Sequence, residues 1–343
     1  MVNKNPFAMS WKVAKMRSAE FEVLTPNEVI VKMPKFGLVV DDLHDFIARE
    51  LPVREAMLSP WLLNQSLAMI HSWRGIGKTH VALGIAYAIA SGGKFLSWSA
   101  TAPKKVLFID GEMPGSALQD RLAAIISSSD SEARAGMLRI VTPDIQTGFM
   151  PDLSTEVGQA ALDEIIEQDT ALVVIDNLSA LCRSGKENEA ESWQALATWA
   201  LRQRATGRSV LFIHHSGKDL KQRGTSRRED ILDVVICLRR PADYIPTDGA
   251  CFEVNFEKAR HLHGDNVQPV EARLSTDERG KQLWTTRLVE ESTFDRVVSL
   301  AAEGLSQKEI ADVLDINKSN VSRAWRKAEV QGLIAGKGGK NGR

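Results

Sequence analysis

The stretch from Leu67 to Gly93, LAMIHSWRGIGKTHVALGIAYAIASGG, is the strongest constraint on the fold of this chain of 343 residues. The apolar run LAMIHS predicts a buried strand, and the apolar segment after Gly77 predicts a helix. Gly75 and Gly77 lie between them and allow backbone conformations that other residues avoid. A strand, a glycine-containing turn and a helix N-terminus together form a typical phosphate cradle, because backbone N–H groups point inward there.

The turn follows the pattern G-x-x-x-x-G-K-[ST], except that Ser72 stands at the first glycine position. In such a turn the lysine, here Lys78, reaches the β- and γ-phosphates, and the hydroxyl of Thr79 holds Mg²⁺. We therefore expect a nucleoside triphosphate to contact the whole turn. The expected contacts are Ser72, Trp73, Arg74, Gly75, Ile76, Gly77, Lys78, Thr79 and His80.

Strand and helix patterns alternate after the cradle. Apolar runs at 67–72, 105–112, 138–143, 171–177 and 209–216 predict strands, and helical patterns fall at 78–91, 116–127, 155–168 and 189–206. This alternation predicts an α/β fold with a mostly parallel sheet and helices on both faces. Three further strand patterns, at 231–240, 251–260 and 268–275, predict a mostly antiparallel extension of that sheet.

Acidic residues and histidines follow the predicted strands. In an open α/β sheet the carboxyl ends of the strands carry the ligand. Asp110 and Glu112 end the second strand, and we expect Glu112 to polarise the attacking water. Asp176 ends the run ALVVID and would complete the magnesium shell together with Thr79. Either His214 or His215, at the end of SVLFIHH, would contact the γ-phosphate.

Together, the elements HSWRGIGKT, VLFIDGEMP, LVVIDN, FIHHSGK and RGTSRREDILDVVICLRR resemble the RecA-like hexameric ATPases. The likeness is nearest to the RepA-type helicases of broad-host-range plasmids, with the DnaB-type replicative helicases next. It implies a RecA-like P-loop NTPase core that takes ATP and Mg²⁺, assembles into a hexameric homo-oligomer and passes single-stranded DNA through the ring channel. A Glu after the second strand is the general base in such families, which supports Glu112.

The same resemblance implies an arginine finger that enters the neighbouring subunit's site. The families use a Lys-x-Arg pair on a late strand, here Lys258 and Arg260, whereas the RepA members resemble this chain at Arg223 in RGTS. Arg260 comes first and Arg223 second among the two candidates. A finger supplied in this way makes hydrolysis depend on assembly, because the cation stabilises charge on the γ-phosphoryl oxygens.

Positive charge is local in this chain, whose net charge is −1. The segment GKDLKQRGTSRRED contains no aromatic residue, so we expect it to contact a nucleic-acid backbone rather than stack on bases. A solvated basic loop is the alternative. The basic residues of the segment are Lys218, Lys221, Arg223, Arg227 and Arg228.

Residues 289–335 have a helical pattern that resembles a helix-turn-helix DNA-binding domain, which could carry a wing. The alternative is a three-helix unit that docks another protein. Ser306 and Glu309 predict a capping box, and Asp315 stands in the turn. The predicted inward residues are Ile310, Ala311, Leu314, Val321 and Trp325. The predicted DNA contacts are Ser319, Asn320 and Arg323 toward base edges and Arg326 and Lys327 toward phosphates, followed by a basic tail at 336–343 with Lys337, Lys340 and Arg343.

The remaining regions are less informative. Residues 1–50 form an N-terminal extension of unclear role, with two short strands expected in 21–40 and a capped helix in 41–52, before the core at 51–288. No apolar run approaches the roughly 18 residues of a membrane span, and the N-terminus lacks a secretory pattern, so we expect a cytoplasmic protein. Cys182, Cys237 and Cys251 have no C-x-x-C spacing, which predicts reduced thiols and no zinc site.

Three functions fit these patterns. The first is a ring-shaped ATPase that moves along DNA, encoded by a plasmid, phage or integrated element. The second is a DNA-binding regulator of transcription or replication that uses ATP as an assembly switch. The third is a filament-forming ATPase of recombination or repair.

Overall fold

The structure is a computed structural model that describes residues 13–17, 20–24, 38–183, 189–217, 230–241 and 244–334. The chain divides into two units, Met1–Val53 and Arg54–Arg343. In the first unit β1 (Val13–Arg17) pairs antiparallel with β2 (Glu20–Leu24). The helix α1 (Leu43–Ala48) begins at Asp42, whose Oδ1 accepts a hydrogen bond from His44 N at 2.9 Å. The predicted capped helix is confirmed. Of the two strands expected in 21–40, only β2 overlaps the prediction, and residues 25–37 lie outside the described part.

The second unit contains a sheet of nine strands within the described residues, in the order β15-β14-β13-β12-β5-β11-β10-β8-β9. The strands from β12 to β9 are parallel, and β13, β14 and β15 extend the sheet in antiparallel pairing. The parallel strands are β5 (Leu67–Ser72), β8 (Lys105–Asp110), β9 (Leu138–Val141), β10 (Thr170–Asp176), β11 (Ser209–His215) and β12 (Val234–Arg239). The antiparallel strands are β13 (Cys251–Ala259), β14 (Val270–Thr276) and β15 (Gln282–Leu288).

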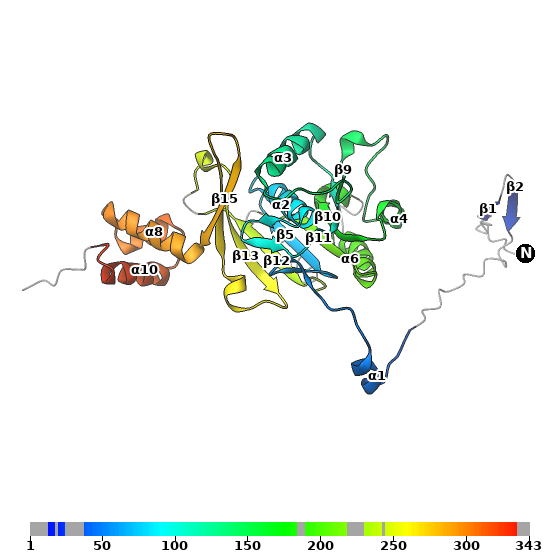
Figure 1. Cartoon of the computed structure of the whole chain (residues 1–343), viewed down its shortest axis with the longest axis horizontal. Helices are drawn as coiled ribbons and strands as arrows, with labels where there is room; N and C mark the ends of the chain where they lie inside the picture. Colours follow the sequence, from blue (N-terminus) through cyan, green and yellow to red (C-terminus); the bar gives the residue numbers. More distant parts are fainter. Residues whose placement is uncertain are drawn as a thin grey trace, which may run out of the picture. The chain divides into compact units, whose positions relative to one another are not determined.

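Helices cover both faces of the sheet. The helices α2 (Lys78–Ser91) and α3 (Gly115–Ser128) pack on one face, whereas α4 (Glu156–Ile165), α5 (Leu178–Leu181) and α6 (Glu189–Ala205) pack on the other (Figure 1). Alternate residues of β5 point to opposite faces, so that Ile70 joins the core with α2 and Met69 joins the core with α6. Burial on both sides explains why the central parallel strands are mostly apolar. The predicted α/β class with a mostly parallel sheet is confirmed.

The structure adds elements that the sequence patterns did not indicate. The strand β15 lies at the sheet edge, and only its alternate side chains are partly buried. A separate four-stranded sheet forms from β3 (Ala56–Ser59), β4 (Leu62–Leu63), β6 (Lys94–Phe95) and β7 (Trp98–Ala100), whose strands are too short to give a sequence period. The helix predicted at 155–168 ends earlier, at Ile165.

The last part of the unit consists of the helices α8 (Val289–Ala302), α9 (Gln307–Val313) and α10 (Lys318–Val330). They share a small core of their own, made by Val297, Ile310, Ala311, Leu314 and Val321, against which Trp325 packs. The predicted capping box of Ser306 and Glu309 is present, and Asp315 adopts a φ of +48° between α9 and α10. Among the described residues, no helix combines the length and apolar character needed to cross a bilayer.

Candidate functional site

A cavity of about 360 Å³ lies at the carboxyl ends of β5, β8, β10 and β11. The parallel register brings these ends together, because Asp176 pairs with Asp110 and His215 pairs with Ser72. The lining therefore combines four regions that are far apart in the sequence. It is made by Gly75, Gly77, Lys78, Thr79, Asp110, Glu112, Met113, Pro114, Arg121, Asp176, Asn177 and His215.

The predicted cradle joins β5 to α2. Gly75 has a φ of +74° and Gly77 a φ of +121°, which is the left-handed region that favours glycine. Gly77 directly precedes α2, so the N-terminus of that helix opens toward the cavity. The turn is braced from the antiparallel side of the sheet, because Arg240 Nη2 donates to Gly75 O at 2.9 Å and Phe252 packs beside Gly77.

Lys78 is buried and lies on the turn itself. Its Nζ donates to Ser72 O at 3.0 Å, to Ser72 Oγ at 3.1 Å and to Trp73 O at 3.0 Å. Burial lowers the pKa of Lys78 to about 8, although the charges of Asp176 and Glu112 oppose this change. The side chain remains mostly protonated at neutral pH and is a buried cation at the base of the cradle.

Two carboxyl groups are buried at the ends of β8 and β10. Burial raises the pKa of Asp110 to about 6 and that of Asp176 to about 7. Asp110 Oδ2 accepts from Met113 N at 3.0 Å and from Thr142 Oγ1 at 3.4 Å. This bonding indicates that Asp110 holds the loop after β8 in place.

Asp176 is the better candidate for contact with a metal ion. It makes a hydrogen bond with the Thr79 side chain, but its Oδ2 is buried and has no hydrogen-bond partner within the described residues. A buried carboxylate oxygen without a partner is costly unless a cation or water satisfies it. Oxygen ligands are also those that Mg²⁺ prefers. The residues Thr79 and Asp176 therefore fit the predicted magnesium site.

Glu112 carries the most exposed carboxylate of the cavity. Asn177 Nδ2 donates to Glu112 Oε2 at 2.5 Å, and His215 Nε2 lies 3.6 Å from the same oxygen. Burial, followed by the charge of Lys78, lowers the pKa of His215, so the imidazole is neutral at pH 7. A carboxylate that is oriented by an amide and reaches an open cavity has the properties of a general base. Of the two histidines left open by the sequence, His215 lines the cavity; His214 is buried and does not belong to the described lining.

Some predicted contacts lie behind the cavity rather than on its surface. Ser72 and Trp73 do not line the cavity, but they accept hydrogen bonds from Lys78, which does. Ile76 is buried. Arg74 is exposed next to the turn. The ring of His80 packs edge-on against Trp284, with ring centroids 5.5 Å apart.

Lys258, on β13, and Arg260, directly after β13, are not part of their own chain's cavity. Ala259, between them, pairs with Val234, which in turn pairs with Ala68 near the start of β5. Lys258 and Arg260 therefore lie toward the amino-terminal ends of the parallel strands, whereas the cradle lies at their carboxyl ends. Arg260 Nη2 bonds to the carbonyl of Asp230. The predicted basic residues Lys218, Lys221, Arg223, Arg227, Arg228, Lys337, Lys340 and Arg343 lie outside the described residues.

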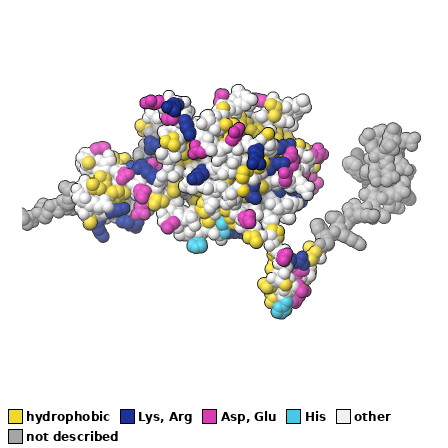
Figure 2. Space-filling model, viewed as in Figure 1, with side chains coloured by type: hydrophobic (Ala, Val, Ile, Leu, Met, Phe, Trp, Pro, Cys, Tyr) yellow, Lys and Arg dark blue, Asp and Glu magenta, His cyan; other side chains and the backbone are white. Residues whose placement is uncertain are grey.

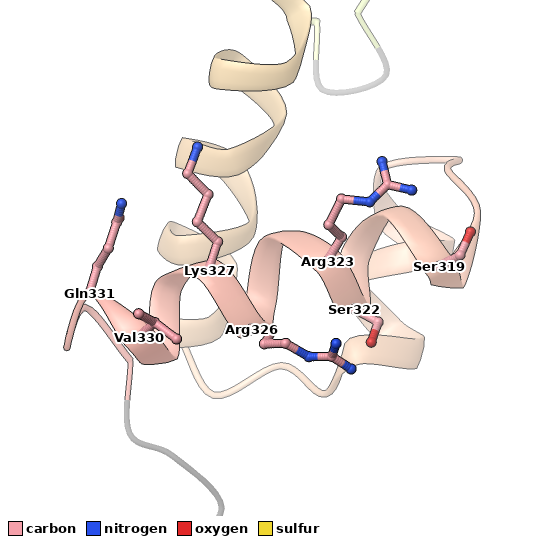
Figure 3. Close-up of a pocket in the computed structure, with 7 residues that line it drawn as sticks. All are labelled: Ser319, Ser322, Arg323, Arg326, Lys327, Val330 and Gln331. Atoms are coloured by element: carbon pink, nitrogen blue, oxygen red, sulfur yellow. The ribbon is translucent and has the colours of Figure 1, made fainter.

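A second candidate site follows one face of α10. Ser319, Asn320, Arg323, Arg326 and Lys327, the predicted DNA contacts, are all exposed. A surface hollow on α10 and the residue that follows it is lined by Ser319, Ser322, Arg323, Arg326, Lys327, Val330 and Gln331 (Figure 3). Asn320 instead lines a groove with Phe294 of α8, and Lys327 Nζ lies 4.8 Å from the Phe294 ring centroid. Lys and Arg side chains gather along this side of the C-terminal helices (Figure 2).

Sequence reasoning missed several cavity residues. Arg121 is an exposed residue within α3, and no local pattern separates it from other surface arginines. Asn177 follows Asp176 directly and could have been found, since its amide is a natural partner for a nearby carboxylate. Arg240 braces the cradle from the end of β12, a position that depends on the antiparallel extension.

Comparison with known proteins identifies the family to which the chain is similar. Residues 34–221, more than half of the chain, match the family described as AAA domain. Among curated proteins, no sequence matches the chain. Two solved structures are similar to it: the KaiC-like protein of the hyperthermophilic archaeon Pyrococcus horikoshii OT3 and the RadB recombinase. The first has a TM-score of 0.46 at 14% identity and covers 67% of this chain and 93% of its own. The second has a TM-score of 0.41 at 16% identity and covers 63% of this chain and 90% of its own.

Proposed function

The chain belongs to the AAA domain family, and on this premise we propose that it is a DNA-dependent ring ATPase, a replicative helicase of the plasmid RepA type. One observation carries the proposal. An ammonium, a hydroxyl, two buried carboxyl groups and an exposed carboxylate come from three segments of the chain and line one cavity beside a helix N-terminus. This combination suits the transfer of a phosphoryl group from ATP to water.

The chemistry follows from these side chains. The Lys78 ammonium leaves the carbonyls of Ser72 and Trp73 and stabilises the charge on the γ-phosphoryl oxygens. Glu112 accepts the proton of the attacking water, whose oxygen bonds to the γ-phosphorus while the bridge to the β-phosphate breaks. The products are ADP and inorganic phosphate. Mg²⁺, held by Thr79 and Asp176, would neutralise charge on the β- and γ-phosphate oxygens.

Assembly is the second part of the proposal. No described cation besides Lys78 and Arg121 lines the cavity, and transition states of phosphoryl transfer are commonly stabilised by a further arginine. Arg260 is exposed and lies away from its own cavity, as a residue that enters a neighbour's site must. We infer that Arg260, with Lys258, completes the site of the next subunit in a hexamer.

DNA is the third part. The segment 218–229, which carries Lys221, Arg227 and Arg228, would contact the backbone of a single strand in the ring channel. The exposed cations of α10 would contact duplex DNA as the second helix of a helix-turn-helix. An ATP-switched DNA-binding regulator is the alternative. The observation that favours it is the separate small core of α8, α9 and α10. A unit with its own core would bind DNA whether or not the ATPase core moves along DNA.

The experiment is an ATPase and strand-separation assay on the full chain. A motor hydrolyses ATP faster with single-stranded DNA and unwinds a forked duplex. A regulator binds duplex DNA, turns over slowly and does not unwind, and a filament-forming recombinase gives open helical assemblies in negative-stain images. Absence of both DNA stimulation and unwinding would reject the helicase proposal.

Two variants test the roles within the ring. Glu112→Gln should retain ATP binding and lose hydrolysis by about 10²–10⁴-fold, whereas Glu132→Gln, an exposed control, should not. Arg260→Ala should also lose hydrolysis. Mixed assemblies of Glu112→Gln and Arg260→Ala subunits should recover part of it, because some interfaces then combine an intact base with an intact finger. Failure to recover activity would contradict a finger that acts between subunits.

A further inference from the structure

A buried histidine lies directly behind the cavity without lining it. His71, on β5 next to Ser72, is fully buried, and both ring nitrogens have partners. Nδ1 lies 2.7 Å from Ser216 Oγ, and Nε2 lies 2.8 Å from Glu257 Oε2. The chemistry proposed above does not use this residue.

The partners of His71 lie at the end of one other strand and within another. Ser216 directly follows β11, and Glu257 belongs to β13. In the pairing of β12 with β13, Val235 opposes Lys258 and Ile236 opposes Phe256, so Glu257 is skipped at a β-bulge. Bulges re-aim side chains and often lie next to active sites. Here the residue at the bulge is Glu257, whose carboxylate contacts His71 although β13 and β5 are separated by β12 in the sheet.

The contact is an ion pair. Burial alone would lower the pKa of His71, but hydrogen bonds to Cys237 and Glu257 raise it to about 9, so the ring is an imidazolium at pH 7. Arg239 Nη2 donates to the other oxygen of Glu257, Oε1, at 3.0 Å. Glu257 is thus fixed between two cations, and the side chain has little freedom to move independently of β5.

The same residues connect to the cavity through Ser72 and Ser216. The carbonyl of Ser72 accepts from Lys78 Nζ at 3.0 Å and from Ser216 N at 2.9 Å. Ser216 follows His215, whose Nε2 lies 3.6 Å from Glu112 Oε2. A continuous set of hydrogen bonds and chain neighbours thus leads from Lys78 and His215 through Ser216 and His71 to Glu257.

We propose that His71 and Glu257 are positioning residues that connect the nucleotide cavity to β13, so that the nucleotide state sets the position of Lys258 and Arg260. The inference rests on the proposed ATPase function. Its geometry requires no contact of either residue with ATP.

The test compares Glu257→Gln with Glu253→Gln, the same change on the same strand. For the full chain, kcat and KM for ATP are measured with single-stranded DNA. Glu257→Gln removes the ion pair and should lower kcat by about 10–100-fold while KM stays unchanged, because catalytic geometry is lost but nucleotide contacts are not. Glu253→Gln should leave both constants near those of the unsubstituted chain. A merely structural role would instead lower the thermal stability without this split between kcat and KM.

A second variant keeps the test decisive if Glu257→Gln folds poorly. His71→Gln combined with Glu257→Gln replaces the ion pair by two amides that can hydrogen-bond to each other, and it should restore folding and part of kcat. Equal kcat values for Glu257→Gln and Glu253→Gln, in a chain that hydrolyses ATP, would overturn the connection but not the ATPase. If the unsubstituted chain hydrolyses no ATP, the proposed function fails first.

The zinc content of the purified chain supplies the last outcome. The ligand atoms of His71, Cys237 and Glu257 lie within 4.8 Å of one another, a spacing that a metal ion could also use. The proposal expects no zinc to copurify. One zinc per chain that disappears in Cys237→Ser but persists in Cys251→Ser would overturn it in favour of a metal site.

Discussion

The nucleotide cavity and the exposed face of α10 are built in opposite ways. The cavity collects its charged groups from the ends of separate strands and buries several of them, so that burial shifts their pKa values. The α10 face takes its charged groups from thirteen consecutive residues and leaves them in water. In the cavity one side chain depends on many others, whereas on α10 each contributes nearly independently. Substitutions should therefore act cooperatively in the first region and additively in the second.

The largest expected effect is that of Lys78→Ala. Removing the one buried cation of the cradle should lower kcat by about 10²–10³-fold, the usual cost of losing a preorganised group that stabilises developing charge. Steady-state ATP hydrolysis measures it, with the exposed Lys94→Ala as the control. A loss of less than tenfold would mean that the cavity does not act as a unit.

On α10, replacing Arg326 and Lys327 by Ala should weaken duplex DNA binding and make it less dependent on salt. If each contacts one phosphate, the slope of log K against log salt should fall by about 2, since each contact contributes about 0.9. ATP hydrolysis without DNA should not change. Lys308→Ala, an equally exposed residue of α9, is the control, and binding titrations at several salt concentrations are the measurement. An unchanged slope would favour the protein-docking alternative.

Asp176→Asn should stabilise the fold while it removes activity. Burial raises the pKa of Asp176 to about 7, above the value near 4 of an unfolded chain. The folded state thus binds this proton more tightly, and the free energy of unfolding falls as the pH rises between those values. At pH 8 the Tm of the variant should rise by roughly 2–4 °C for each kcal/mol gained in the free energy of unfolding, and at pH 4 the Tm should change little. Thermal unfolding at both pH values measures this, with the exposed Asp312→Asn as the control; a lower Tm at pH 8 would contradict it.

The smallest effect is expected at the N-terminus of α9. Ser306→Ala removes the capping box with Glu309 and should cost about 1 kcal/mol of helix stability. The loss should show in thermal unfolding and in weaker duplex binding, but not in ATP hydrolysis, because the small core of α8, α9 and α10 is its own. Ser299→Ala, exposed on α8, is the control. An equal loss in both variants would assign no special role to the cap.

The same contrast explains what the sequence could predict. The cradle, the apolar parallel strands and the capped helices depend on neighbours in the chain, so their patterns were sufficient. Asp176 and Glu112 were found because parallel strands must end at one edge. Arg121 and Arg240 were not, because their roles come from helix packing and from the antiparallel strands, which no local period encodes. The strand β15 was missed because an edge strand with mostly exposed side chains has a weak apolar pattern.

The three oxygen acceptors around the Lys78 ammonium have a consequence for ligand selection. A ligand gains from this lysine only if it replaces those oxygens with its own. A nucleoside brings no anionic oxygen to replace them, whereas a phosphate group brings up to three oxygens together with negative charge. The turn therefore favours a phosphorylated ligand over a nucleoside before any group recognises the base.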